Sequence, residues 1–581
     1  MKWLLKNADE ERVRALTSAL GGVTPPIKDP AQKATLARLL VMRGIEDGES
    51  AQKFLSPSLS HLYSPYLLTG MKAAVERIDA AIERKETVLI YGDYDVDGTT
   101  AIVILKTAIE LCGGVADFHV PHRIKEGYDL RGDRIEQAAA EGIRLVVSVD
   151  TGIRAFTAAE TAHRLGVDLI VTDHHLPGPH GMPRALAVLN PNQPECEYPC
   201  KTLCGAGVAF KLAQALMERR IPDKDQSRLL ASFLKIVAIA TVADAVPLTG
   251  ENRVFAKLGL DALQKAVNPG LKALLEVSQL GGRPLTSGEV AFRIAPRINA
   301  AGRMDVARDV IDLFSTKDAQ QAQDIANKLD QLNGARQKEE REILESIKAR
   351  VEEEPALRDA YCVVIDGDGW HRGVIGITAT RVVELFGRPA LVISRNGEEA
   401  HGSGRSISAF HLLNALESCA SLFTRFGGHA HAAGFSMPSD KIPALREHLD
   451  VYARERLTLT DFEPILHFDA ELPLEQVTPG LFHLLERLQP FGVGNPEPVF
   501  AASGVRLMAV PRVLKEKHVK LKLGSGKNGV VHSALGWRMA ERFHEAGLLP
   551  GDTLDIAFTL DHNDHPDFGG LELTLRDFKK S

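Results

Sequence analysis

The sequence predicts an α/β protein of several domains, with a parallel, doubly wound sheet in its first half and a small β-barrel at its C-terminal end. The chain has 581 residues, which is more than one domain usually holds. Strand-like and helical runs alternate from about residue 86, as they do in parallel sheets. A charged stretch with few Gly and Pro then leads into a second alternating region. These observations favour two α/β domains joined by a long connector helix.

Five segments follow from these patterns. They are an N-terminal lead-in (1–70), a first α/β domain (71–309), a connector helix (310–356), a second α/β domain (357–457) and a β-rich C-terminal domain (458–581). The lead-in is rich in helical and loop patterns and is interrupted at Pro25-Pro26. The connector is rich in Ala, Gln, Glu, Lys and Arg, and a solvated helix face accounts for most of its charges.

The first α/β domain is predicted from short apolar runs that each end in polar residues. The predicted strands are 87–91, 145–149 and 168–172, and the predicted helices are 99–112 and 155–165. In doubly wound sheets, ligands bind beyond the carboxyl ends of the strands. The second α/β domain has similar runs at 361–365 and 389–393, and the C-terminal runs 518–523, 554–558 and 571–575 fit a small Greek-key barrel.

Composition limits the class of protein. Hydrophobic residues make up 44% and charged residues 25%, as in ordinary globular proteins. The net charge of −7 argues against indiscriminate nucleic-acid binding, although it leaves room for a local basic channel. The first residues become charged before an apolar signal region can form, and runs such as 236–243 are too short to span a bilayer. We therefore expect a soluble, cytoplasmic protein without a membrane partner.

The six cysteines give little sign of a disulfide framework, because their density is low. Cys196, Cys200 and Cys204 are each separated by three residues, which suggests a metal or cluster site. They lack the paired C-x2-C of common zinc sites, so free thiols in a loop are the simpler interpretation.

The first predicted strand is followed by Asp93, Asp95 and Asp97. Alternate side chains of an extended segment share one face, although a turn at the strand end would spread them. Crowding three carboxylates without a cation would be costly. A calcium loop also begins D-x-D-x-D-G, but it needs a glutamate where this chain has Ile104, so that interpretation fails.

Three more polar clusters follow later apolar runs. Asp150 alone is equally compatible with a helix cap. Asp173-His174-His175 suits metal ligation with support from neighbouring groups. Asp244 ends an apolar run as either a cap or a ligand. Oxygen and imidazole ligands without thiolates favour Mn²⁺ or Mg²⁺ over structural zinc, and two such ions could bridge a phosphoryl group.

Taken in order, these four clusters resemble the motifs of the DHH phosphoesterase superfamily. The resemblance continues through residues 297–303, 402–406 and 427–430, and covers the chain from about residue 40 onward. It implies a DHH catalytic domain, a DHHA1 substrate-binding domain and a C-terminal barrel of the oligonucleotide-binding (OB) type.

The resemblance also implies a division of labour at two metal sites. Asp95 would hold one ion and Asp97 the other, and Asp150 would bridge both. His174 and Asp244 would complete the second site. Some relatives have a histidine where this chain has Tyr91, which leaves the ligand set of the first ion open.

The remaining acids and histidine of these motifs would support the ligands or face the substrate. These are Asp93, Asp173 and His175. The resemblance implies that Asp173 and His175 also take part in catalysis. Because arginine matches phosphate oxygens well, arginines of the later motifs are candidates for substrate binding, although any single arginine could be a surface ion pair. The substrate-binding candidates are Arg123, Arg297, Asn299, Arg303, Ser403, Arg405, Ser406, Gly428 and His429. A tight glycine turn with an incidental histidine is the alternative for Gly428 and His429.

The implied activity is hydrolysis of single-stranded DNA from its 5′ end to mononucleotides, with two Mn²⁺ or Mg²⁺ ions, in recombination and repair. Lys515, Lys517, Lys520 and Lys522 give the barrel a basic face for single strands, with few aromatic residues for stacking. A single-strand-binding protein and a repair helicase are the partners that the resemblance suggests. Three alternatives remain open. The chain could be a hydrolase of small substrates, namely short oligoribonucleotides, cyclic dinucleotides or pyrophosphate. It could also be a non-enzymatic scaffold, or its barrel could serve only to close the cleft.

Overall fold

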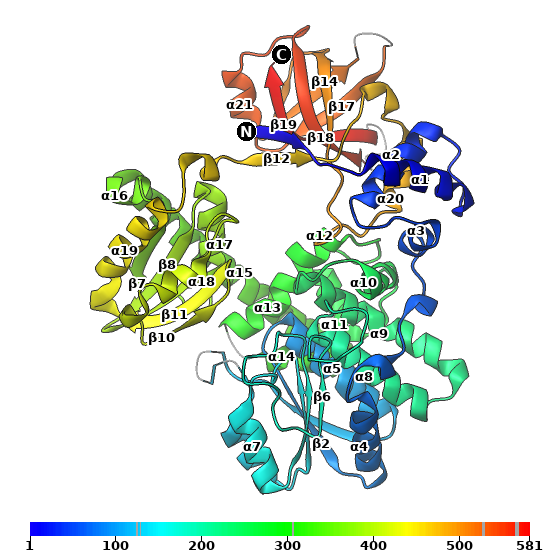
Figure 1. Cartoon of the computed structure of the whole chain (residues 1–581), viewed down its shortest axis with the longest axis vertical. Coiled ribbons are helices and arrows are strands. Elements are labelled where there is room, and N and C mark those ends of the chain that lie inside the picture. Colours follow the sequence, from blue (N-terminus) through cyan, green and yellow to red (C-terminus); the bar gives the residue numbers. More distant parts are fainter. Residues whose placement is uncertain (124–125, 128, 305–306, 526–528, 564–568, 581) are drawn as a thin grey trace.

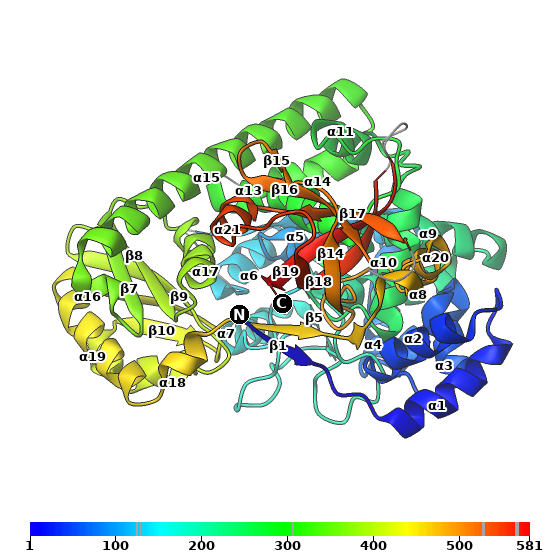
Figure 2. The same ribbon diagram turned by 90° about the horizontal axis from the view of Figure 1, so that it is seen from above.

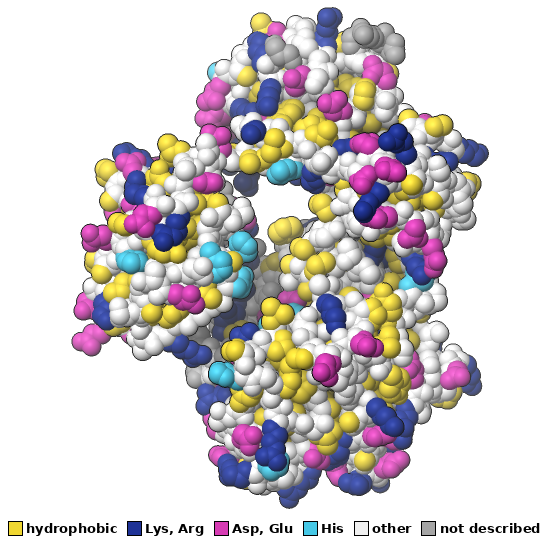
Figure 3. Space-filling view, in the orientation of Figure 1, with side chains coloured by type: hydrophobic (Ala, Val, Ile, Leu, Met, Phe, Trp, Pro, Cys, Tyr) yellow, Lys and Arg dark blue, Asp and Glu magenta, His cyan; other side chains and the backbone are white. Residues whose placement is uncertain are grey.

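The computed structural model describes the chain except residues 124–125, 128, 305–306, 526–528, 564–568 and 581. Its parts form a ring (Figure 1). The catalytic domain lies opposite the C-terminal sheet, with the second α/β domain on one side and the N-terminal helices on the other. The space-filling view shows an opening through the middle of this ring (Figure 3).

The catalytic domain contains the predicted parallel sheet. Its strands are β2 (Thr87–Gly92), β3 (Val115–His119), β4 (Leu145–Val149), β5 (Asp168–Thr172) and β6 (Ala187–Leu189), in the order β3-β2-β4-β5-β6. All neighbouring pairs are parallel. Side chains that alternate along these strands enter two separate apolar clusters, so both faces of the sheet are buried. The doubly wound prediction is confirmed.

Helices cover the two faces of this sheet. One face packs against α4 (Met71–Glu83), α5 (Val96–Leu111) and α8 (Gly205–Arg220), and the other packs against α6 (Gly132–Ala140) and α7 (Phe156–Leu165). The remaining helices of the domain are α9 (Asp223–Ala243), α10 (Gly250–Leu263), α11 (Pro269–Val277), α12 (Ser287–Glu289), α13 (Ala295–Met304) and α14 (Arg308–Ser315). The first expected helix, 99–112, begins three residues earlier than predicted because Asp95 caps it.

The connector is the single long helix α15 (Ala319–Glu353), which begins nine residues later than expected. The start of the predicted segment belongs to α14, and Asp318 caps the N-terminus of α15. At 1.5 Å per residue, its 35 residues span about 52 Å. Figure 2 shows α15 running from the catalytic domain to the second α/β domain.

The second α/β domain has a five-stranded sheet of mixed direction. Its strands are β7 (Val363–Asp368), β8 (Ala390–Asn396), β9 (Glu399–Arg405), β10 (Arg425–Gly428) and β11 (Ala432–Pro438), in the order β10-β11-β9-β8-β7. Only β7 and β8 are parallel. The helices are α16 (Pro355–Arg358), α17 (Ile375–Phe386), α18 (Leu412–Glu417) and α19 (Ile442–Arg454).

The C-terminal sheet curls into a partly closed ring of five strands. They are β14 (Phe500–Leu507), β16 (His518–Gly524), β17 (Val531–Gly536), β18 (Thr553–Asn563) and β19 (Gly570–Lys580). Pairing runs β14-β18-β19-β17-β16, and a short pairing of β16 with β14 brings the ends together. Short strands β13 (Ala470–Glu471) and β15 (Arg512–Leu514) extend this sheet, and α20 (Pro479–Glu486) and α21 (Ala540–Glu545) accompany it.

The N-terminal lead-in is part of this C-terminal unit rather than a separate module. Its helices α1 (Glu10–Ala19), α2 (Pro30–Val41) and α3 (Gly48–Leu55) share one apolar cluster with residues of the curled sheet. Strand β1 (Lys2–Leu5) pairs with β12 (Ile465–Phe468). The two ends of the chain therefore build one core.

Helix α9 corrects one expectation from the sequence. The run 236–243 seemed too short to span a bilayer, but it lies in a helix of 21 residues that is long and apolar enough by length and composition alone. Within the described part of the chain, it is the one such helix. Its apolar residues enter the core of the catalytic domain, with those of α5 and α8.

Candidate active site

The Asp-rich loop lies between β2 and α5, at the carboxyl edge of the sheet. Asp95 caps α5, and its side chain accepts a hydrogen bond from the Gly98 N–H at 3.1 Å. A Cβ at Gly98 would lie 2.6 Å from the backbone N and O of Asp93, so the loop closes tightly on the first turn of the helix. The three aspartates are therefore spread by a turn instead of sharing one extended face.

Asp97 is held by the N-terminus of α8. Its two carboxylate oxygens accept hydrogen bonds from the backbone N–H groups of Gly205, at 2.6 Å, and Ala206, at 2.8 Å. A Cβ on Gly205 would lie 2.5 Å from the Cβ of Asp150, so only glycine lets α8 approach both acids. The sequence reasoning missed this clamp, which joins residues more than a hundred positions apart.

Asp150 follows β4 and takes no part in capping a helix, because Ala155 is the N-cap of α7. Its φ of +58° is left-handed, a conformation that Asp tolerates better than most residues. Its N–H donates to the Thr172 carbonyl at 2.9 Å. The backbone at Asp150 therefore departs from the strand and directs the side chain to the edge of the sheet.

Asp173 supports the two histidines that follow it. Its Oδ1 accepts from the His174 N–H at 2.7 Å and lies 2.7 Å from His175 Nδ1, while its Oδ2 accepts from the Ile153 N–H at 2.9 Å. Burial opposes the charge on Asp173, but its bonds to His175 and Ile153 outweigh this and lower the pKa of Asp173. Burial also opposes the charge on His175, and the bond to Asp173 outweighs it and raises the pKa of His175 to about 9.

His174 lies at the centre of the remaining acids. Its Nε2 is 3.3 Å from Asp150 Oδ1 and 3.8 Å from both Asp97 Oδ2 and Asp244 Oδ2. Asp244 caps the C-terminus of α9, where a negative charge is unfavourable. Its position therefore fits a ligand better than a stabilising cap.

The potential ligand atoms fall into groups within 4.8 Å of one another. One group contains Asp97, His174 and Asp244, and another contains Asp93, Asp95 and Asp150; a third joins His175 to Asp150 and His174. The first group coincides with the expected second metal site. In the other, the Asp93 carboxylate lies with those of Asp95 and Asp150 among the potential ligand atoms. The Tyr91 hydroxyl donates to the Asp129 carbonyl at 3.0 Å.

The electrostatics of these groups fit a divalent cation. Burial, reinforced by neighbouring acids, raises the pKa of Asp93 to about 8 and that of Asp244 to about 9, and raises the pKa of Asp150 well above its usual value. One buried carboxylate oxygen on each of these three residues has no hydrogen-bond partner among the described residues. Buried carboxylate oxygens without a hydrogen-bond partner are groups that a bound cation would stabilise.

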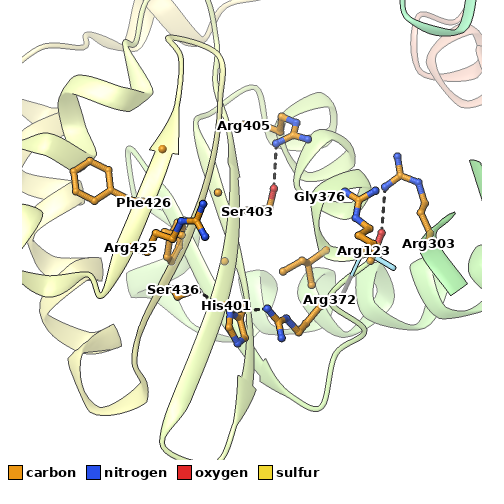
Figure 4. Close-up of a pocket in the computed structure, with 16 residues that line it drawn as sticks. Arg123, Arg303, Arg372, Gly376, His401, Ser403, Arg405, Arg425, Phe426 and Ser436 are labelled. Carbon is orange, nitrogen blue, oxygen red and sulfur yellow. Dashed lines mark hydrogen bonds between the residues drawn. The ribbon is translucent and has the colours of Figure 1, made fainter. Parts of the chain in front are cut away.

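An arginine-lined cavity of about 550 Å³ lies between the catalytic domain and the second α/β domain (Figure 4). Five arginines line it: Arg123, Arg303, Arg372, Arg405 and Arg425. Among the described residues that line this cavity, none is acidic. Within this lining, an anionic ligand would therefore meet several positively charged arginines and no competing carboxylate.

Some of these arginines are held in place by hydrogen bonds. Arg405 Nη1 donates to Ser403 Oγ at 3.1 Å, Arg372 Nη2 to His401 Nδ1 at 3.0 Å, and Arg303 Nη1 to the Gly373 carbonyl at 3.2 Å. Burial, then the nearby Arg123, lowers the pKa of Arg303 to about 10 and also lowers the pKa of Arg405.

The cavity adjoins the Asp-rich loop. The guanidinium carbon of Arg123 lies 4.8 Å from the centre of the Tyr94 ring. Tyr94 lies between Asp93 and Asp95, which contribute to one group of potential ligand atoms. A substrate anchored among the arginines would therefore lie beside the carboxylates.

The structure brings only some of the predicted substrate-binding residues to this cavity. Arg123, Arg303, Ser403 and Arg405 line it. Those outside its lining are Arg297, Asn299, Ser406, Gly428 and His429. Arg297 Nε instead donates to Asp330 of α15 at 2.8 Å, and Asn299 Oδ1 accepts from the Val96 N–H at 3.2 Å, so both hold the domain together.

The other three have local roles. Ser406 Oγ donates to the Phe410 carbonyl at 2.7 Å. Gly428 ends β10, and its φ of +153° is a left-handed value that favours glycine. The adjacent His429 lies in the turn between β10 and β11, and its Nδ1 accepts from the His431 N–H. The segment is a tight glycine turn beside Gly427, which lines the cavity, and substrate binding by Gly428 and His429 stays a prediction.

Sequence reasoning missed Arg372, His401 and Arg425, which also line the cavity. Arg372 is followed by Gly373 just before the start of α17, and this position could have marked it as a candidate from the sequence. His401 and Arg425 lie within strands and carry no such mark.

Comparison with known proteins agrees with this architecture. The chain matches three family models: the DHH family N-terminal domain over residues 87–241, the DHHA1 domain over 359–455 and the RecJ OB domain over 468–577. It is 36% identical to the single-stranded-DNA-specific exonuclease RecJ of Bacillus subtilis, over 99% of this chain and 70% of that protein. It is 33% identical to RecJ of Escherichia coli K12, over 93% of this chain and 91% of that protein.

The chain belongs to the RecJ family. Its structure resembles that of RecJ from Thermus thermophilus in complex with Mn²⁺, with a TM-score of 0.81 and 28% identity, over 100% of this chain and 80% of that one. The Mg²⁺ complex of the same RecJ gives a TM-score of 0.76. The expected DHH resemblance and the three-domain RecJ architecture are confirmed.

Proposed function

We propose that the chain is a metal-dependent exonuclease that degrades single-stranded DNA from the 5′ end and releases 5′-mononucleotides. The observation that supports this most directly is the juxtaposition of a buried carboxylate and imidazole cluster with an arginine-lined cavity. Relatives named as single-stranded-DNA-specific exonucleases support the same activity.

Two divalent cations, Mn²⁺ or Mg²⁺, would be held at the two groups of ligand atoms. Asp97, His174 and Asp244 would hold one, and Asp95 and Asp150 would hold the other, with Asp93 beside them. Bound ions of this kind supply Lewis-acid stabilisation of charge on phosphoryl oxygens. The protein's own contribution is to fix the ligands: the N-terminus of α8 clamps Asp97, and Asp173 orients the histidine pair.

The arginine-lined cavity would bind the terminal 5′ phosphate. Arg123 and Arg303 come from the catalytic domain, and Arg405 with Ser403 comes from the facing sheet, so a phosphate held between them would bridge both domains. Anchoring the terminal phosphate beside the carboxylates would place the next phosphodiester at the metal groups, which accounts for the release of single nucleotides from the 5′ end.

The rest of the ring would bind the strand further along. Lys520 and Lys522 lie on the outward face of β16, while Val519, Leu521 and Leu523 enter its core. Lys520 lies 3.1 Å from Glu572, and Lys522 donates to Ser533 Oγ, so their charges are partly engaged. The exposed Trp537 offers a stacking surface that the sequence reasoning did not anticipate.

We place the activity in recombination and repair in the cytoplasm, with a single-strand-binding protein and a helicase as candidate partners. The activity is tested by time courses on long single strands labelled at the 5′ or the 3′ end, with duplex and dinucleotide substrates in parallel. Early release of the 5′ label as a mononucleotide from single strands is expected. Preferential cleavage of the dinucleotide would instead favour a small-substrate hydrolase.

A further inference from the structure

A tight turn of the C-terminal unit lies against the loop that carries Asp244. Residues 490–496, which we call the linker hairpin, connect α20 to the curled sheet. Gly492 and Asn495 exchange backbone hydrogen bonds of 2.9 and 3.1 Å, which close the turn. At its tip the Val493 carbonyl accepts a 2.8 Å hydrogen bond from Leu248, four residues after Asp244.

The contact between the loop and the hairpin is close. A Cβ on Gly492 would lie 2.7 Å from Leu248 Cδ1, and a Cβ on Gly494 would lie 3.0 Å from Pro247 Cβ. These two glycines therefore let the hairpin fit beneath residues 247–248. Any side chain at either position would push on the loop.

The last turn of α9 holds the backbone of Asp244, whose N–H donates to the Ala240 carbonyl at 2.8 Å, but the loop that follows has little regular structure. Asp244 closes α9, and the next residue, Ala245, has a left-handed φ of +57° that turns the chain sharply. Regular structure resumes only at Gly250, the start of α10. Asn252 donates from Nδ2 to the Pro247 carbonyl at 3.1 Å, so the hairpin and Asn252 both hold residues 247–248.

The hairpin is itself firmly anchored. Asn495 is fully buried, and its Nδ2 donates to the Leu488 and Pro490 carbonyls at 2.7 and 2.8 Å. Its Oδ1 accepts from Arg43 Nε of the N-terminal unit at 2.6 Å. On the catalytic side, Ser287 Oγ donates to the Phe491 carbonyl.

A buried arginine of α10 holds the residues just before the linker hairpin. Arg253 donates to the backbone carbonyls of Leu488, at 2.9 Å, and Gln489, at 3.0 Å, and to that of Phe54 at 2.7 Å. Its guanidinium carbon also lies 3.7 Å from the centre of the Phe54 ring. The far end of the Asp244 loop is therefore fastened to the C-terminal unit as well.

We propose that the linker hairpin is a positioning element for Asp244, so that the C-terminal unit sets cation affinity at the Asp97, His174 and Asp244 group. The inference rests on the metal centre of the proposed function. Asp244 Oδ2 lies 3.8 Å from His174 Nε2 and makes no hydrogen bond among the described residues, so its place depends on the backbone that carries it. Groups that orient ligands commonly change metal affinity when they are altered.

Two alanine substitutions separate positioning from general stability. Gly494→Ala and Gly504→Ala both place a side chain on a left-handed backbone, at φ values of +71° and +67°. Gly494 faces Pro247, whereas nothing lies within 4 Å of a Cβ on Gly504. The free-energy cost of placing alanine in a left-handed conformation is therefore similar in both variants. Only Gly494→Ala also pushes on the Asp244 loop.

The readout is Mn²⁺ binding to the full chain without DNA, measured by electron paramagnetic resonance of the free ion. Gly494→Ala should weaken one Mn²⁺ site up to about tenfold, and Gly504→Ala should leave it unchanged. The exonuclease rate of Gly494→Ala should approach the wild-type value at saturating Mn²⁺. Equal Mn²⁺ affinities in the two variants would overturn the inference.

Ser287→Ala covers the case in which Gly494→Ala does not fold. It removes only the anchor to the Phe491 carbonyl, and it should weaken the same Mn²⁺ site by a smaller factor. Unchanged affinity in a folded Ser287→Ala protein would count against the hairpin. If the wild-type chain bound no Mn²⁺, the proposed metal centre itself would be wrong. If the wild-type chain bound Mn²⁺ and the variants bound it equally well, only the role of the hairpin would be wrong.

Discussion

Arg405→Ala should remove much of the preference for a 5′-phosphorylated strand. Arg405 lines the cavity, and its Nη1 is committed to Ser403 Oγ and the Gly404 carbonyl, which leaves its other N–H groups for a ligand. A hydrogen bond to a charged group contributes about 2–3 kcal/mol, so kcat/KM on a 5′-phosphorylated strand should fall about 30- to 150-fold. A strand with a 5′ hydroxyl lacks the phosphate that Arg405 would hold, and should lose much less.

The assay compares kcat/KM on matched strands that differ only in the 5′ group. Arg297→Ala is the control, since this arginine belongs to a neighbouring motif but pairs with Asp330 outside the cavity. It should leave the ratio between the two strands at the wild-type value. The assignment of the cavity to the 5′ phosphate is wrong if Arg405→Ala slows both strands by the same factor.

Further predictions concern the metal centre and the ring. Asp150→Ala should abolish nuclease activity while circular dichroism still reports a folded chain; wild-type cleavage by this variant would refute the metal assignment. Because burial raises the pKa of Asp93 to about 8 and of Asp244 to about 9, the cation-free protein should lose stability as pH rises from about 4 to about 9, through the range where these carboxyls must ionise. Saturating Mn²⁺ should flatten that profile of melting temperature against pH, and an unchanged slope would contradict the reasoning. Arg253→Met should cost about 3 kcal/mol in urea unfolding, since it leaves buried carbonyls without a donor, and a change below about 1 kcal/mol would show that water replaces the guanidinium.

The parts of the site that the sequence predicted are those with a local signal. Acids that directly follow apolar runs, such as Asp150 and Asp173, could be placed at one sheet edge because parallel strands end together. The clamp of Gly205 on Asp97 carries no such signal, because it depends on how α8 packs across the domain. Arg425 in β10 was likewise invisible, since its role arises only when two domains face each other.

Arg297 is the converse case, a candidate from the sequence that the structure places outside the cavity lining. It lies in a motif of the right kind, yet tertiary packing turns it toward α15. Motif membership identified the neighbourhood, but the direction of each side chain was set by contacts that sequence spacing does not encode. The shared core of the N-terminal helices and the C-terminal sheet was missed for the same reason.

That shared core has a consequence for how the chain is made. Helices α1–α3 are synthesised well before α20 and the strands after it, yet they share one apolar cluster with residues of those elements. Contacts between residues so distant in sequence form slowly, and exposed apolar surface promotes aggregation in the meantime. A nascent chain that stalls before α20 would therefore leave the apolar residues of α1–α3 without their partners in this cluster.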